Sequence, residues 1–200
     1  MLLCVGRVRE GLQMRTRLHA LDPFVLVFNA FTVDALWLAK NDRAAIKMLQ
    51  TDLVAGAAHP FVSRQTALIY GVQGKHREAA DAILKSAHSY DPVIVTAAAK
   101  FMAGDWSVPA GRSLALFDML YVFSDTPEQA LGFFETNLTA GMWQAAEAPQ
   151  FWHPSPKFAA LRATRRFKDL MRNAGVVDYW RERGWPDALC RASGGSFACD

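Results

Sequence analysis

The sequence predicts an all-α fold, a right-handed stack of antiparallel helix pairs that a helical cap closes at its C-terminal end. Three observations predict it. A short motif recurs with a period of about 34 residues, apolar residues follow helical spacing on both sides of it, and 52% of the 200 residues are hydrophobic. This composition excludes a disordered chain, a collagen and a disulfide-dense miniprotein. We expect the repeat array over residues 1–105, with an incomplete first repeat, and a helical extension and cap over residues 106–200.

The recurring motif is a short segment that we expect to turn the chain between two helices. Its three copies occupy residues 6–11, 39–44 and 74–79, and their last residues are 33 and 35 positions apart. A proline follows the second helix of each pair and begins a new apolar run, at Pro23, Pro60 and Pro92. The unit is therefore a helix, a tight turn, a second helix and a proline.

The residues inside this unit have the sizes that closely packed helix pairs require. Ala67 and Ala79 fall where the two helices approach, Tyr70 fills the gap between them, and Ile83 supplies a bulky side chain one turn after Ala79. With this pattern and period, the chain resembles a tetratricopeptide-repeat (TPR) protein. The resemblance implies a TPR-like helical-hairpin solenoid over roughly residues 1–105.

The C-terminal end carries a second resemblance. Residues 162–172 and 175–187, followed by Cys190 and Cys199, are similar to the end of a proteobacterial group of regulators. In that group a TPR array follows a winged-helix DNA-binding domain or a class III nucleotide cyclase domain, often with a TolB-like segment between. The resemblance implies a sensory or partner-binding module, and we expect a C-terminal fragment or truncated relative of such a regulator.

The two ends of the array lead to further expectations. Residues 6–22 match a second helix, so its first helix is missing unless residues 1–5 replace it, and Leu2, Leu3, Val5 and Val8 are expected to lack their usual cover. Beyond the array we expect helices over 109–123 and 126–139, the second opened by a capping box at Thr126. A loop over 150–156, helices over 156–163 and 164–173, and a last turn over 178–183 complete the cap.

The first helices of successive pairs are expected to line a concave groove. In the repeat register the groove-facing positions are Leu26, Asn29, Val33, Trp37, Phe61, Arg64, Leu68, Asp91, Ile94 and Phe101. Asn29, Arg64 and Asp91 are polar groups able to fix a bound peptide. Trp37 and Phe61 are apolar anchors, and Leu68 lies beside them. The same side chains could instead pack against the cap or against a neighbouring chain.

The sequence offers no recognisable catalytic, cofactor or metal site, and we expect no enzyme activity. The five histidines show no zinc-ligand spacing, and the glycines form no phosphate-binding loop. Asp178 and Glu182 stand four residues apart, but they alternate with arginines and are interpreted as a solvated, salt-bridging face. The basic residues between Arg162 and Arg172 are interpreted in the same way, as the outer face of amphipathic helices.

The charge distribution argues against a nucleic-acid partner, and the longest apolar run argues against a membrane span. Residues 155–200 carry nine basic and five acidic side chains, which is too sparse for a nucleic-acid interface. Residues 24–39 are too few to span a bilayer and include Asn29 and Asp34. We therefore expect a protein or peptide partner, without direct nucleic-acid contact and without a membrane span.

Three functions and two locations stay open at this point. The first function is a non-catalytic interaction or sensory module, and the second is an enzyme with an unrecognised helical active site. The third is homodimerisation, which a large apolar contact between identical chains, especially over Leu2 to Val8, would favour. Cys190 and Cys199 are close enough in sequence to form a disulfide, which would favour a periplasmic location. Two reduced cysteines in the cytoplasm are the equal alternative, and Cys4 is expected to be a small buried residue.

Overall fold

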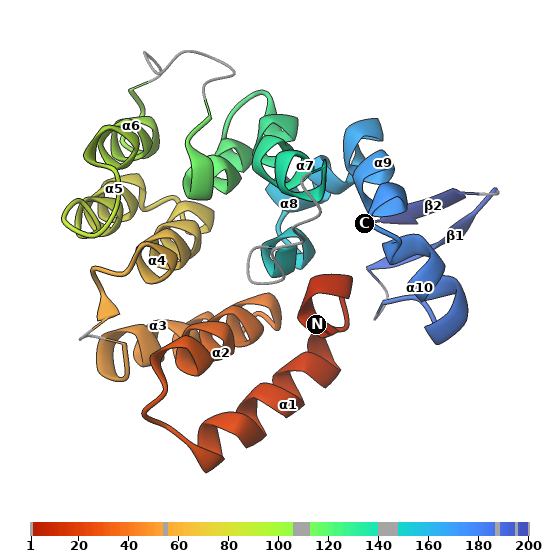
Figure 1. Ribbon diagram of the computed structural model, residues 1–200, viewed down its shortest axis with the longest axis horizontal. Helices are drawn as coiled ribbons and strands as arrows, with labels where there is room; N and C mark the ends of the chain where they lie inside the picture. The colour runs from red at the N-terminus through yellow and green to blue at the C-terminus, as the bar shows by residue number, and fades with distance from the viewer. Residues whose placement is uncertain are drawn as a thin grey trace.

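The computed structural model describes residues 2–53, 56–105, 113–139, 148–186, 189–194 and 196–199, and it is mostly helical. In the first half of the chain the described elements include the short 3-10 segment η1 (Leu2–Val5) and the helices α1 (Val8–Leu21), α2 (Leu26–Leu38), α3 (Asp42–Thr51), α4 (Pro60–Val72), α5 (His76–Leu84) and α6 (Pro92–Met102). Successive helices pack against each other and follow an arc (Figure 1).

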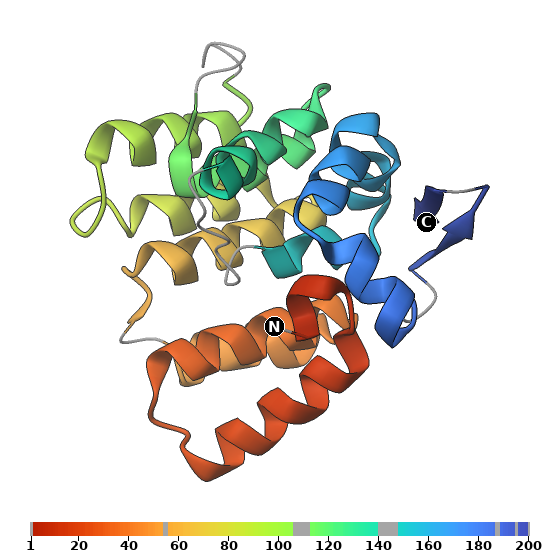
Figure 2. The ribbon, with the colours of Figure 1, turned by 45° about the vertical axis from the view of Figure 1, so that its right-hand side comes forward.

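The second half forms shorter elements. They are η3 (Ala115–Phe123), η4 (Pro127–Leu131), α7 (Gly132–Thr139), η5 (Ala148–Trp152), α8 (Pro156–Ala163), α9 (Arg165–Asn173) and α10 (Val176–Arg183), then β1 (Cys190–Ser193) and β2 (Ser196–Cys199). The two strands form an antiparallel hairpin in which Cys190 pairs with Cys199. A disulfide joins these two cysteines. In Figure 2 the η5 segment lies inside the arc of the first helices.

The same backbone turn recurs at four places in the first half. Gly6, Lys40, Gly74 and Gly104 all have positive φ angles, and the first three are 34 residues apart. At each of them the residue's own amide donates to the carbonyl three residues earlier, and the next amide donates to the carbonyl five residues before itself. This is the hydrogen-bond pattern of a Schellman motif, which ends a helix sharply. The short segment η1 ends in this turn too, and so occupies the place of a first helix.

The helix pairs of the array are closely packed where the sequence predicts small residues. Ala67 and Ala79 are fully buried in the neighbouring helices α4 and α5, Ile83 is buried, and Tyr70 is half-buried. Pro60 and Pro92 open α4 and α6, where the missing amide costs nothing because a helix leaves its first amides unpaired.

The extension differs from the expectations in three places. Residues 115–123 form a 3-10 segment, while positions 109–112 of the expected helix lie outside the described residues. Thr126 makes no side-chain cap, and the chain passes through the 3-10 segment η4 before α7 begins at Gly132. The expected loop after position 150 overlaps η5, and α10 begins two residues earlier than expected. The pair α8 and α9 agrees with the sequence to within one residue.

The C-terminal part of the chain returns to the N-terminal segment. The indole Nε1 of Trp152 donates to the carbonyl of Cys4 at 3.0 Å, and that of Trp180 donates to the carbonyl of Val5 at 2.9 Å. Leu3, Val5 and Val8 are buried. The expectation that these side chains lack cover is therefore wrong, because the chain's own cap covers them. A homodimer contact through this segment loses its basis for the same reason.

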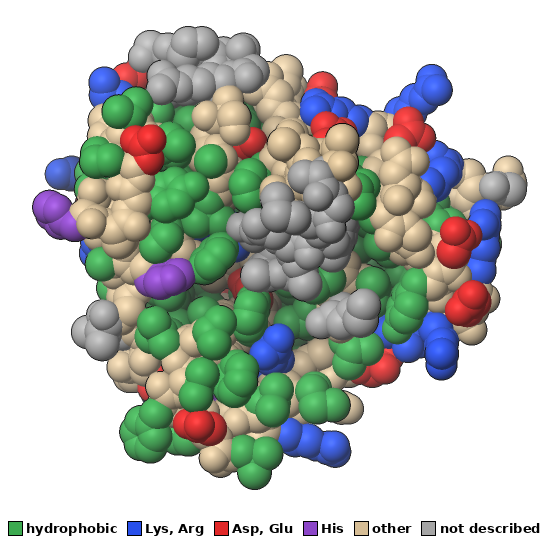
Figure 3. Space-filling view, in the orientation of Figure 1, with side chains coloured by type: hydrophobic (Ala, Val, Ile, Leu, Met, Phe, Trp, Pro, Cys, Tyr) green, Lys and Arg blue, Asp and Glu red, His purple; other side chains and the backbone are tan. Residues whose placement is uncertain are grey.

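Several large apolar side chains remain exposed along α1, in the turn after it and at the start of α2. They are Met14, Leu21, Phe24 and Val27, of which Phe24 is 92% exposed. In Figure 3 hydrophobic side chains gather over this part of α1 and α2. Within the described residues, none of the helices combines the length and the apolar character needed to cross a bilayer.

Candidate binding site between helices α2 and α4

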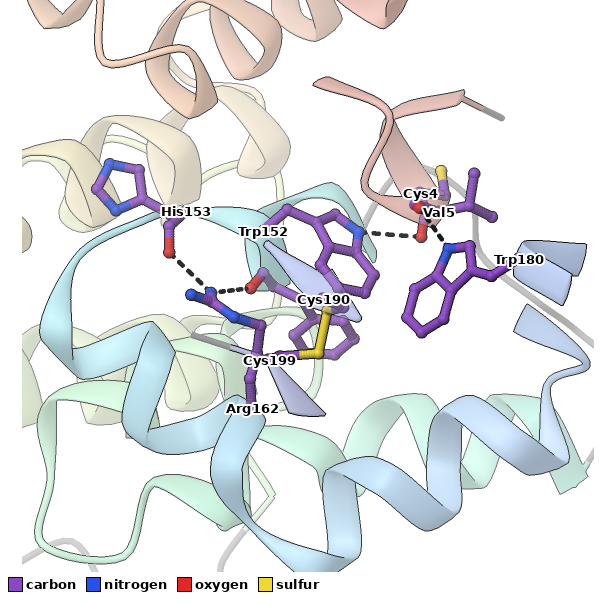
Figure 4. Close-up of a disulfide and its surroundings, with 9 residues drawn as sticks. Cys4, Val5, Trp152, His153, Arg162, Trp180, Cys190 and Cys199 are labelled. Carbon is purple, nitrogen blue, oxygen red and sulfur yellow. Dashed lines mark hydrogen bonds between the residues drawn. A yellow bond between two sulfur atoms is a disulfide. The ribbon is translucent and has the colours of Figure 1, made fainter. Parts of the chain in front are cut away.

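The chain's own C-terminal extension fills much of the groove that the repeat register predicts. The imidazole ring of His153 stacks on the indole of Trp37 with 4.1 Å between the ring centroids. Arg162 holds this segment in place, because its Nη1 donates to the carbonyls of Phe151 and His153 at 2.7 and 2.8 Å (Figure 4). Trp37 is fully buried. The prediction that Trp37 anchors a partner is therefore wrong, since its ring is buried against His153 and Phe158 of the same chain.

Three more predicted groove residues have structural roles. Asn29 is buried and joins the ends of α1 and α2: its Oδ1 lies 2.8 Å from His19 Nδ1, and its Nδ2 donates to the carbonyl of Pro23. Leu68 is fully buried in the core. Asp91 is exposed and caps α6 by accepting from the amides of Val93 and Ile94. Asn29 and Leu68 are therefore not presented to a partner as predicted, whereas Asp91 is exposed and the prediction for it stays open.

Phe61 and Arg64 do line a cavity, together with residues that the sequence analysis did not select. This α2–α4 cavity has a volume of about 150 Å³. Its lining consists of Leu26, Val27, Ala30, Phe31, Asp34, His59, Phe61, Val62, Arg64 and Gln65. Phe31 and Phe61 are half-buried and Val27 and His59 are exposed, whereas Asp34, Arg64 and Gln65 are at most 5% exposed. The cavity therefore has an apolar rim and a buried polar floor, which we define as Asp34, Arg64 and Gln65.

A hydrogen-bond network connects the polar floor to η5. Gln150 Nε2 donates to Asp34 Oδ1 at 3.2 Å and to Gln65 Oε1 at 3.3 Å. Arg64 Nη1 reaches the carbonyl of Leu116 at 3.5 Å. Among the described residues, Gln65 Nε2 and Gln150 Oε1 are buried without a hydrogen-bond partner. Leaving a buried polar atom unpaired costs about 1–3 kcal/mol, so the floor has hydrogen-bonding capacity that the described fold does not use.

Burial sets the electrostatics of the floor. Burial of the carboxyl group raises the pKa of Asp34 to about 7, and the charge of Arg64, the hydrogen bond from Gln150 and the charge of Arg15 oppose this rise. Arg15 comes from α1, and its guanidinium lies 4.6 Å from the centroid of the Phe31 ring. Two cationic side chains therefore act on one carboxyl group that is only partly ionised at neutral pH.

A larger hollow of about 620 Å³ lies between the ends of α4 and α6, η3 and the start of α8. Its buried lining residues are apolar or glycine, and His76 and Lys157 are exposed. Ser155 is half-buried, and its Oγ lacks a hydrogen-bond partner among the described residues. One hydroxyl group is less than the set of polar groups that usually fixes the orientation of a ligand. In the described part of the chain, His, Cys, Asp and Glu side chains form no group of three suited to a metal ion.

The sequence contains a signal for part of this site. Asp34 is a charged residue inside the apolar run 24–39, and a buried charge of this kind needs partners. Gln65 and Gln150 give no such signal, because polar residues on a helix or in a loop are ordinarily solvated. Comparison of the chain with protein-family models, with curated proteins and with solved structures finds no match.

Proposed function

We propose that the chain is a non-catalytic interaction or sensory module of the TPR type, from a bacterial signalling or transcription regulator, which binds a peptide or protein partner at the α2–α4 cavity. The recurring turn at Gly6, Lys40 and Gly74 supports the repeat assignment, because its spacing of 34 residues is the TPR period. The cavity lies between α2 and α4, the first helices of successive pairs, where repeat proteins bind their partners.

The size of the cavity carries the proposal. Pockets for drug-sized ligands and cofactors usually measure about 300–1,000 Å³. An apolar cavity of about 150 Å³ holds a single benzene ring, so the α2–α4 cavity fits one side chain of a larger partner. The exposed side chains of Leu21, Phe24 and Val27 lie at the end of α1, in the turn after it and at the start of α2, and they provide apolar surface for the residues that flank this side chain.

A peptide selection tests the proposal. A displayed random peptide library is selected on the immobilised full chain, and the enriched peptides are titrated against Phe31→Ala, Phe61→Ala and the control Val93→Ala. Truncating an aromatic anchor costs more than about 1.4 kcal/mol, so we expect at least a tenfold loss of affinity in the first two variants. Val93 is exposed on α6, and its variant should bind like the wild type. Enriched peptides that bind both Phe variants at full affinity would show that the cavity is not the binding site.

One observation favours an enzyme as the second candidate. Asp34 lines a cavity, and burial raises its pKa to about 7, which suits a general acid or base near neutral pH. A panel of p-nitrophenyl esters and anilides distinguishes the two functions. An enzyme of this kind would give turnover that Asp34→Asn abolishes and Val93→Ala retains. The binding module gives no turnover that depends on Asp34.

A further inference from the structure

We propose that the α2–α4 cavity selects an aromatic or branched apolar group that bears a carboxylate, with the apolar part between Phe31 and Phe61 and the carboxylate on Arg64 and Gln65. This inference rests on the proposed binding function of the same cavity and names the chemistry of what it takes. The carboxylate could come from a free small acid or from the last residue of a peptide, and the experiment below distinguishes these two sources.

Hydrogen-bonding capacity on the floor favours an acceptor. Gln65 is 4% exposed, and its Nε2 lacks a hydrogen-bond partner among the described residues although the side chain lines the cavity. Beside it, Arg64 brings a planar guanidinium that is 3% exposed and permanently charged. A carboxylate accepts from both groups, and charge-assisted hydrogen bonds of this type are about twice as strong as neutral ones.

The balance of charge favours an anion over a cation. The groups that act on the Asp34 carboxyl come from four elements: Arg15 on α1, Arg64 on α4, the neutral amide of Gln150 on η5 and the thiol of Cys4 on η1. Two of the four are cations, and burial raises the pKa of that thiol, which keeps it neutral. Both arginines would repel an ammonium ligand, whereas both would attract a carboxylate.

The Asp34 carboxyl gives the inference a pH signature. A carboxylate bound beside Asp34 stabilises the protonated form of Asp34, so binding takes up a proton. Burial already raises the pKa of Asp34 to about 7, which means that this proton is present below pH 7 and must be acquired above it. The affinity is therefore constant at lower pH and falls by up to about tenfold for each pH unit above 7.

Three aromatic probes of similar size, one anionic, one neutral and one cationic, test the chemistry. Benzoate, benzamide and benzylamine are each titrated into the ¹⁵N-labelled full chain at pH 6 and pH 8, and binding is measured from amide shift changes. We expect benzoate to shift the amides of Phe31, Asp34, Phe61 and Gln65, to bind at least tenfold more tightly than benzamide, and to weaken at pH 8. Benzylamine should leave these amides unchanged. Equal affinity for benzoate and benzamide, or preference for benzylamine, would overturn the assignment.

A matched pair of variants locates the carboxylate. Gln65→Met retains the length of the side chain and removes its amide, and it should weaken benzoate about tenfold. Gln13→Met makes the same change at an exposed position of α1 and should have no effect. Far-UV circular dichroism confirms that both variants fold, and the wild-type pH profile tests the inference without any substitution. Unchanged benzoate affinity in Gln65→Met would place the carboxylate elsewhere.

A peptide ending in Phe shows whether the carboxylate comes from a free small acid or from the last residue of a peptide. The same experiment tests the carboxylate assignment independently of the proposed function. Binding of the free-acid peptide, with loss on C-terminal amidation, identifies a chain end as the source. Binding of benzoate alone identifies a small acid and removes support for a peptide partner, while the carboxylate assignment stands. If selected peptides need Phe61 but bind equally with an amidated end, and benzoate does not bind, the proposed function stands and this inference fails.

Discussion

Arg162 shows how one buried charge organises the centre of the molecule. Its side chain is fully buried, and its guanidinium donates to two carbonyl groups around η5, the segment that fills the predicted groove. The prediction that Arg162 lies on a solvated face is therefore wrong. Arg162 lies four residues after Phe158 and therefore shares its buried face of α8. Helical spacing places Arg162 on the buried face of α8, but it does not reveal that the carbonyl groups of Phe151 and His153 need a hydrogen-bond donor there.

Replacing this arginine tests its role. Arg162→Met retains most of the length of the side chain and leaves both carbonyl groups without their charged donor. We expect the free energy of unfolding, measured by urea denaturation, to fall by about 2–5 kcal/mol. Arg165→Met is the matched control, because the Arg165 side chain is 95% exposed, and its effect should stay within about 0.5 kcal/mol. A loss below 1 kcal/mol in Arg162→Met would show that these hydrogen bonds contribute little.

Two buried titratable groups should give opposite slopes of stability against pH. Burial raises the pKa of Asp34 from 3.8 to about 7, so its contribution to stability is complete below pH 4 and is lost as the pH rises through 7. Burial, with the charges of Arg162 and Lys40, lowers the pKa of His153 from 6.5 to about 3. The stability from neutral His153 is complete above pH 6.5 and is lost as the pH falls toward 3. The two contributions partly cancel between pH 4 and pH 6.5.

Removing the carboxyl group of Asp34 should reveal how His153 alone makes the free energy of unfolding depend on pH. We expect the unfolding free energy of Asp34→Asn to fall more steeply than that of the wild type between pH 7 and pH 4. The difference between the two proteins should change by up to about 4 kcal/mol over this range. The measurement is urea denaturation at four pH values, with Val93→Ala as a control that carries no titratable change. Parallel curves for Asp34→Asn and the wild type would show that Asp34 titrates normally in the folded chain.

At the scale of the elements, the sequence predicts the array better than the extension. The helix-ending turns at Gly6 and Gly74 follow from glycine and the repeat, and Lys40 adopts the same conformation without glycine. The segment η3 is harder to predict, because the side chains from Leu116 to Val122 are all buried and offer no polar face from which a period could be read. The segment begins after Leu114, whose amide donates to the carboxyl group of Asp118. The capping pattern that the sequence shows at Thr126 does not reveal this hydrogen bond.

The close contact within one helix pair yields the next prediction. Ala79 is fully buried in α5, and a larger side chain there must separate α5 from its neighbours α4 and α6. We expect Ala79→Leu to lower the free energy of unfolding by about 1–3 kcal/mol through overpacking, measured by thermal and urea denaturation. Ala20→Leu makes the same change at an exposed position of α1 and should be nearly neutral. Equal stability of the two variants would argue against the repeat register.

At the scale of the whole molecule, the contacts that decide the site span most of the chain. Gln150 reaches Asp34 across 116 residues, and Trp180 reaches Val5 across 175. Local patterns predict helices, turns and the faces that must be buried, but not which distant segment buries them. For this reason the structure covers Trp37, a predicted partner anchor, with His153 of the same chain. Phe61 and Arg64 line a cavity, and their role in binding stays a prediction.

The return of the C-terminal end to the N-terminal end leads to the last prediction. Trp180 is fully buried and donates to the carbonyl of Val5, and the Arg7 guanidinium donates to the carbonyl of Arg183 at 2.6 Å. Deleting residues 176–200 removes these contacts and exposes apolar side chains of α9 and η1, among them Phe167. We expect the truncated chain to aggregate, measured by size-exclusion chromatography, because an uncovered end of a helical stack is apolar.

The same truncation separates the structural role of the cap from binding. The α2–α4 cavity and Gln150 lie outside the deleted residues, so the soluble fraction of the truncated chain should still bind peptides selected on the full chain. Trp180→Phe in the full chain is the milder comparison, because it removes one hydrogen bond and retains most of the ring. It should lower stability without causing aggregation. If the truncated chain instead stays monomeric and as stable as the full chain but loses its peptides, the tail is the binding element, and the cavity between α2 and α4 is not.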